Sequence, residues 1–158
     1  MGAKRAHIAF VEVKGPISDP VTKFGGQPVW LEKPQWPLSR STGLPMKFIG
    51  QIRIETELFP GDGLRMAYLF IGEDEDGSSE TWQAEGGENA LILQPGSGAC
   101  VEVTPTSTGP SLYRMVEKRG HDRLVPVACE YAVALELGED PPPPSDEDLA
   151  TWDEKWRR

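Results

Sequence analysis

The residue types that carry catalysis are sparse in this chain, and their spacing fits no catalytic motif. The histidines are His7 and His121, and the cysteines are Cys100 and Cys129. No Gly-x-Ser-x-Gly sequence occurs, and the glycines of Gly96-Ser97-Gly98 are too close together for a nucleophile elbow. Because the members of a catalytic triad meet only in the folded protein, a Ser-His-Asp or Cys-His pair stays open. The simpler interpretation is that both histidines are ordinary surface residues.

Metal and phosphate sites are not indicated either. There is no Cys-x-x-Cys and no histidine pair at i, i+4, so we expect no zinc site. Residues 74–77 resemble part of a calcium loop, but the register places Gly72 first and Gln83 last, where carboxylates are needed. No Walker sequence is present, and Gly61-x-Gly63 continues with Met66 where the dinucleotide fingerprint has glycine. The sequence therefore predicts no metal and no cofactor.

Acidic side chains are concentrated in one part of the chain, whose net charge is −9. Residues 1–60 carry 8 basic and 5 acidic side chains, whereas residues 61–158 carry 8 basic and 20 acidic ones. The densest run, which holds no basic residue, comprises Glu73, Asp74, Glu75, Asp76, Glu80, Glu85 and Glu88. Like charges at this density must face water or a basic partner. We predict these seven residues, with Trp30, as the partner-binding residues; the alternative is a solvated hairpin tip.

Short strands dominate the predicted elements of a 158-residue chain that contains 17 glycines and 15 prolines. Alternating or continuous apolar residues predict strands over residues 6–13, 47–57, 64–72, 89–94, 99–103, 111–117 and 125–137. Residues 15–44 hold five prolines, which leave no room for a regular element. This loop also contains Trp30 and Trp36, whose rings we expect to cover the core rather than to form a ligand box.

The end of the chain predicts a helix. Residues 141–144 are four prolines, and Ser145 follows as an N-cap before three acidic residues. Leu149, Trp152 and Trp156 then share one helical stripe, which we expect to dock on the body. A detachable helix that binds a partner groove is the alternative. The predicted class is β-rich α+β with antiparallel sheets, a single globular domain over 1–140 and a docked connector and helix over 141–158.

The compartment is predicted from two absences. No stretch approaches 18 apolar residues, which excludes a transmembrane helix by sequence. Glu12 and Lys14 interrupt the start of the chain, so no signal peptide is expected. We predict a cytoplasmic protein with reduced cysteines; a secreted domain with one disulfide is the alternative. The negative charge also lacks the basic footprint that nucleic acids and anionic membranes require, so neither is an expected partner.

Three blocks in the first half resemble a known family. They are residues 24–28 (Phe-Gly-Gly-Gln-Pro), Trp36-Pro37 and residues 45–52, and the Tyr68-Leu69-Phe70 strand follows. In this order they resemble the YwqG-like family of uncharacterised bacterial proteins, over about residues 20–72. The resemblance implies a mostly antiparallel β fold and no catalytic residues. The residues agree with it, since Gly25-Gly26 permits positive φ at a close approach. Gln51, between Ile49 and Ile52, is expected to bond loop backbone.

The expected function is that of a non-enzymatic bacterial binding protein. Some YwqG-like proteins are encoded beside toxins, which implies an immunity role for those members. The concrete hypothesis is therefore an immunity protein that neutralises a cognate secreted toxin with a basic surface in the cytosol. Two alternatives stay open: a housekeeping protein-interaction domain, and a small-ligand-binding or enzymatic domain that uses the Trp30 and Trp36 loop.

Overall fold

The computed structural model describes residues 4–55, 63, 65–73, 81–96, 101–118 and 123–139. The regular elements in these ranges are all strands. Their bounds are β1 Lys4–Glu12, β2 Lys23–Gly25, β3 Trp36–Pro37, β4 Lys47–Arg53, β5 Met66–Ile71, β6 Asn89–Gln94, β7 Val103–Thr104, β8 Tyr113–Glu117, β9 Leu124–Ala128 and β10 Glu130–Glu139.

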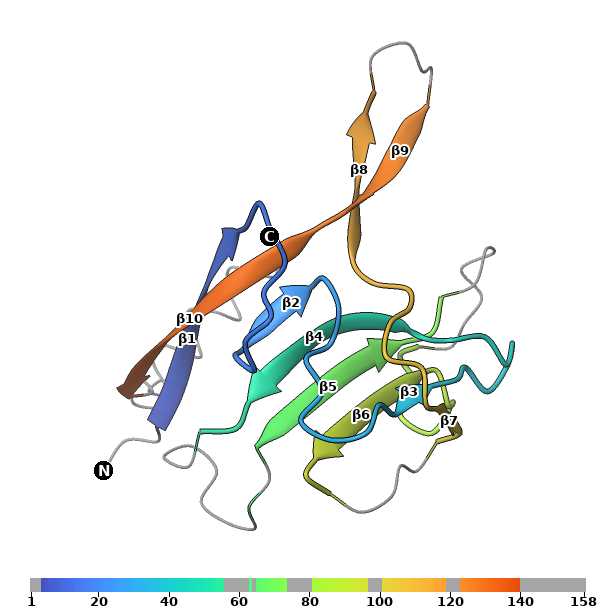
Figure 1. Ribbon diagram of the computed structural model, residues 1–158, viewed down its shortest axis with the longest axis horizontal. Coiled ribbons are helices and arrows are strands. Elements are labelled where there is room, and N and C mark those ends of the chain that lie inside the picture. The colour runs from blue at the N-terminus through green and yellow to red at the C-terminus, as the bar shows by residue number, and fades with distance from the viewer. Residues whose placement is uncertain are drawn as a thin grey trace, which may run out of the picture. The chain divides into compact units, whose positions relative to one another are not determined.

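The largest sheet has six strands in the order β1-β10-β2-β4-β5-β6, and β10, β2, β4, β5 and β6 pair antiparallel (Figure 1). Two small sheets accompany it, β3 with β7 and β8 with β9. The chain divides into two compact units, one formed by Ala9–Ala134 and the other by Met1–Ile8 with Leu135–Arg158. The described part of the smaller unit is the first half of β1 and the second half of β10. All contacts discussed below lie within Ala9–Ala134.

The expected α+β class is wrong, because the elements of the described residues are strands alone. That class depended on a single terminal helix from Ser145 through Leu149, Trp152 and Trp156, and this segment lies outside the described residues. The predicted domain boundary at residue 140 lies outside them as well. The antiparallel β part of the prediction is confirmed, and the described fold is all-β.

Most predicted strands are found close to their expected positions, but the expectation of no regular element in residues 15–44 is wrong, because β2 and β3 lie there. Period-two alternation located β4, and continuous apolar runs located β5 and β6, the last with the expected bounds. The predicted strand over residues 125–137 is instead divided into β9 and β10 at Cys129. The Cys129 amide donates to the Leu112 carbonyl at 3.2 Å, and its carbonyl accepts from the Gly26 amide at 3.1 Å. Cys129 is thus the point at which the chain leaves its pairing with β8 and begins to pair with β2.

The hydrophobic core lies against β4, β5 and β6 and is largely aromatic. Its fully or nearly buried members are Trp36, Met46, Phe48, Met66, Tyr68, Phe70 and Ile92. The Trp36 ring meets the Phe70 ring edge-on at a centroid distance of 5.2 Å, and the Trp36 Nε1 donates to the Met46 carbonyl at 2.8 Å. Burying the indole therefore leaves no unsatisfied donor.

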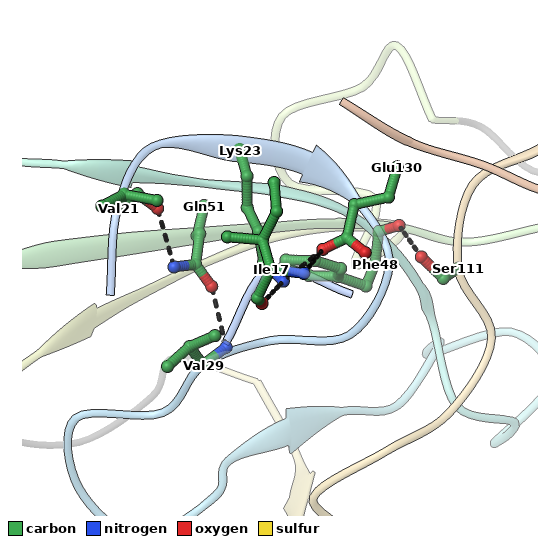
Figure 2. A network of polar contacts seen from close by, with 8 residues as sticks. All are labelled: Ile17, Val21, Lys23, Val29, Phe48, Gln51, Ser111 and Glu130. Carbon is green, nitrogen blue, oxygen red and sulfur yellow. Dashed lines mark hydrogen bonds and ion pairs between the residues drawn. The ribbon is translucent and has the colours of Figure 1, made fainter. Parts of the chain in front are cut away.

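Gln51, buried on β4, holds the backbone on both sides of β2. Its Nε2 donates to the Val21 carbonyl at 2.8 Å, and its Oε1 accepts from the Val29 amide at 2.8 Å (Figure 2). These bonds join the segment before β2 to the loop after it. The expectation that Gln51 bonds loop backbone is confirmed.

Tyr68 and Gln94 extend the same support along the next two strands. The Tyr68 hydroxyl donates to the Val29 carbonyl and accepts from the Leu31 amide, each at 2.9 Å. Burial raises the pKa of Tyr68 to about 12, so its hydroxyl keeps the proton that it donates. On β6, the Gln94 Oε1 accepts from the amides of Leu31 and Glu32, and its Nε2 donates to the Lys33 carbonyl at 3.0 Å. Residues 21–33 are therefore bound to three neighbouring strands by side chains.

Replacing Gln51 by Leu should destabilise the protein markedly. The substitution keeps side-chain bulk but leaves the Val21 carbonyl and the Val29 amide without their partner, at about 1–3 kcal/mol for each buried group. Urea unfolding followed by tryptophan fluorescence measures the loss. Gln83→Leu is the matched control, since that side chain is only half-buried. Equal midpoints for Gln51→Leu and the wild type would contradict this role.

Candidate partner-binding surface

Glu73, the first residue of the acidic run, follows β5 directly and is held in place at the surface. Its carboxylate pairs with the Lys47 Nζ at 2.6 Å and accepts from the Tyr113 hydroxyl at 2.9 Å. The Lys47 ammonium also lies 5.2 Å from the centroid of the Tyr113 ring. Partial burial pulls the pKa of Glu73 upward, but the hydrogen bonds from Lys47 and Tyr113 and the Lys47 charge outweigh it and lower the pKa. Glu73 is therefore ionised at neutral pH.

The rest of the acidic run is not one surface. Glu85 is exposed, and its carbonyl accepts from the Arg40 Nη1 at 2.9 Å. Glu88 is buried, and its carboxylate accepts from the Ser39 hydroxyl at 2.8 Å and the Ser41 amide at 2.9 Å. Glu88 thus holds the turn after β3 instead of facing a partner. Four of the predicted partner-binding residues lie outside the described residues: Asp74, Glu75, Asp76 and Glu80.

Trp30 packs against the core from the loop. Its ring lies 4.6 Å from the Tyr68 ring and stacks on the Phe70 ring at 6.1 Å, both measured between centroids. Its Nε1 donates to the Ser107 carbonyl at 3.0 Å, which joins the loop to the segment after β7. Trp36 is wholly buried. The prediction that both rings cover the core is confirmed, and Trp30 presents only part of its ring to a partner.

An open groove of about 540 Å³ lies at the base of the β8–β9 hairpin. Its lining residues are Gln27, Gly109, Ser111, Leu112, Tyr113, Met115, Pro126 and Ala128. The Gln27 side chain fixes one wall, because its Nε2 donates to the Gly109 carbonyl and its Oε1 accepts from the Gly109 amide, at 3.0 and 2.9 Å. The groove could not be predicted from the sequence, because its walls come from segments that are more than 80 residues apart in the chain.

The buried ion pair between Lys23 and Glu130 was also not predicted from the sequence. The Lys23 Nζ on β2 lies 2.6 Å from the Glu130 Oε1 on β10, and it donates to the Ile17 carbonyl at 2.8 Å. The Ile17 amide donates to the same carboxylate oxygen at 3.2 Å (Figure 2). Gly26, at φ 63°, lies against this carboxylate, where any Cβ would collide with it. The positive φ expected at Gly25-Gly26 is confirmed at both residues.

The remaining candidate residues are not brought together. His7 is exposed and Cys129 is a buried free thiol, while His121 and Cys100 lie outside the described residues. Within the described ranges, no three His, Cys, Asp or Glu side chains lie close enough together to hold a metal ion. The part of the chain that the structure describes contains no helix with the length and apolar character that crossing a membrane requires. No protein-family model and no curated protein matches the chain.

Breaking the Lys23–Glu130 pair should cost far more than breaking a surface pair. Lys23→Met leaves a largely buried carboxylate without its cation, which costs about 3–5 kcal/mol. Combining it with Glu130→Gln should recover most of the loss, because a neutral amide can both accept from the Ile17 amide and donate to its carbonyl. Urea unfolding at neutral pH measures all three proteins.

The surface pair between Arg114 and Glu12 provides the control. The Arg114 Nη2 lies 3.0 Å from the Glu12 Oε1, and both side chains are about half exposed. Arg114→Met should therefore change the unfolding free energy by less than about 1 kcal/mol. If Lys23→Met costs no more than Arg114→Met, the buried pair does not stabilise the fold as described.

Proposed function

We propose that this protein is a non-enzymatic binding protein that captures a basic protein partner in the cytoplasm. In its most concrete form it is an immunity protein that neutralises a cognate secreted toxin. The observation that carries the proposal is the ionised, surface-held Glu73 at the start of a sequence run that contains seven carboxylates and no basic residue. Exposed carboxylates such as Glu73 accelerate the encounter with a basic protein and disfavour the encounter with an acidic one.

The interior supports the proposal indirectly. The buried side chains that carry polar chemistry are engaged in holding loops: Gln51, Tyr68 and Gln94 hold residues 21–33, and Glu88 holds Ser39 and Ser41. A group fixed in this way by two or more internal bonds is not free to bind a small molecule. Recognition in the described part of the chain is therefore assigned to the surface, where Glu73 and Glu85 are exposed.

Two further features favour the immunity form over a general interaction domain. Residues 20–72 resemble YwqG-like proteins, some of which are encoded beside toxins. The acidic charge is also segregated, with 20 acidic and 8 basic side chains in residues 61–158. A toxin inhibitor benefits from such segregation because steering raises the rate of capture before the toxin acts. Trp30 and Trp36 do not favour the small-ligand alternative, since their rings pack on or within the core.

Neutralising part of the acidic run should slow capture of the partner. The variant carries Asp74→Asn, Glu75→Gln and Asp76→Asn, and the probe is the protein that the neighbouring gene encodes. We expect an association rate at least severalfold lower at low salt, and the deficit should shrink above about 0.15 M salt, where the Debye length is about 8 Å. Stopped-flow measurement gives the rate, and survival of cells that express the toxin gives protection.

The control removes the same three charges elsewhere, by Glu102→Gln, Glu136→Gln and Glu139→Gln, all of which are exposed. It should leave both association and protection close to the wild-type values. Cytochrome c, a basic protein with no relation to this chain, tests whether any attraction is specific. Unchanged association and protection in the Asp74, Glu75 and Asp76 variant would assign the run to solubility alone.

A further inference from the structure

The β8–β9 hairpin is largely exposed to solvent. Its five residue pairs run from Tyr113 with Ala128 to Glu117 with Leu124, and neither strand pairs with a third (Figure 1). Large apolar side chains are nonetheless exposed on it, including Tyr113 at 42%, Met115 at 49% and Leu124 at 52%. A lone two-stranded hairpin is at best marginally stable in water, so a covering surface would stabilise this one.

The register separates the hairpin into two different faces. The first, called here the apolar face, carries Tyr113, Met115, Glu117, Leu124, Pro126 and Ala128, all of them exposed. The second carries Arg114, Val116, Val125 and Val127, with Arg114 paired to Glu12. At the base of the hairpin, the apolar face continues into the 540 Å³ groove, which Tyr113, Met115, Pro126 and Ala128 help to line. Exposed apolar side chains on this face thus extend from Leu124 to the groove at the base.

The charge of the hairpin differs from that of the rest of the chain. Between Arg65 and Lys155 the basic residues are Arg114, Lys118, Arg119 and Arg123, and all four lie in residues 113–128. This segment has 4 basic and 2 acidic side chains in a chain whose net charge is −9. Lys118 and Arg123 are exposed beside the tip, whereas the exposed Glu73 carboxylate contacts Tyr113 at the base. Beside the tip the described charged residues are two cations, Lys118 and Arg123, and one carboxylate, Glu117, whereas the base carries the Glu73 carboxylate, which pairs with Lys47.

We propose that the hairpin is a dimerisation arm whose apolar face is covered by the same face of a second copy of this chain. A two-fold arrangement with the arms antiparallel places the tip of each arm over the base of the other. Leu124 of one copy then enters the groove of the other, and Lys118 and Arg123 come close to its Glu73. Glu117, the one carboxylate on the apolar face, comes close to Lys47 of the other copy.

The charge of the arm decides between a second copy and other occupants. A basic partner, as in the proposed function, is repelled by Lys118 and Arg123 at the tip. A second copy instead supplies the Glu73 carboxylate, which contacts Tyr113 at the wall of the groove. The same end-to-end asymmetry disfavours a parallel arrangement, which would bring the two basic tips together. The dimer proposal goes beyond the proposed function, and Glu73 is the residue of the acidic run that it shares.

Sedimentation of the full-length chain tests the proposal. The wild type should sediment as a dimer of twice 17.4 kDa at protein concentrations of about 100 µM, with a dissociation constant in or below the micromolar range. Met115→Asp, at the centre of the apolar face, should raise that constant at least tenfold. Val127→Asp is the matched control, because Val127 is 41% exposed on the opposite face of the same hairpin, and it should leave the dimer intact. Far-UV circular dichroism checks that each variant is folded.

A charge exchange tests the antiparallel arrangement. Arg123→Glu and Glu73→Arg should each weaken the dimer severalfold at low salt, and the two together in one chain should restore it, since both contacts then re-form with reversed sign. A wild type that stays monomeric would overturn the proposal, and so would a Met115→Asp variant that stays dimeric. Binding of the toxin-like protein to the apolar face of a monomeric chain would overturn it as well, in favour of that partner.

Discussion

The constraint on which the described structure depends is the need to hold residues 26–35, the part of a proline-rich segment that lies between β2 and β3 and forms no strand. Residues 15–44 contain five prolines, which lack the amide that a sheet or helix would use. Buried side chains replace those bonds: Gln51, Tyr68 and Gln94 reach from β4, β5 and β6 to the loop backbone. The loop in turn positions Trp30 against the core and leads to Trp36 inside it. The interior is thus organised by polar contacts as much as by apolar ones.

Buried charged side chains also hold together segments that are distant in sequence. Lys23 and Glu130 join β2 to β10 across 107 residues, and both bind the backbone of Ile17. Burying an ion pair yields little net stability compared with an apolar pair, but losing one member is costly. We infer that such pairs fix which segments meet more than how strongly they bind. Glu88 acts similarly, since its carboxylate fixes the turn around Ser39 and Ser41.

The sequence allows the local features of this fold to be predicted, but not the distant ones. β4, β5 and β6 were predictable because alternation and continuous apolar runs are properties of a single segment, and Gln51 was predictable because a polar residue interrupts apolar neighbours there. The division at Cys129 was not, because it depends on Leu112 and Gly26 as partners. The role of Glu88 was missed for the same reason, since a charge run in sequence does not show which carboxylate has an internal donor. The helix expected from Ser145 led to the wrong class because the α part of that class depended on this one terminal segment.

The acidic run and the basic hairpin are surface regions of different charge. Glu73 begins the acidic run in sequence, yet its carboxylate also contacts Lys47 and Tyr113, and Tyr113 belongs to the basic hairpin. The acidic region and the arm are therefore joined through one cluster at the base of β8. A change in charge at Glu73 alters both the field that a basic partner meets and the orientation of Tyr113 at the edge of the groove. The Glu73 carboxylate belongs to both regions. Substitutions at Asp74, Glu75 and Asp76 therefore test the charge of the acidic run alone, whereas a substitution at Glu73 also changes the hairpin.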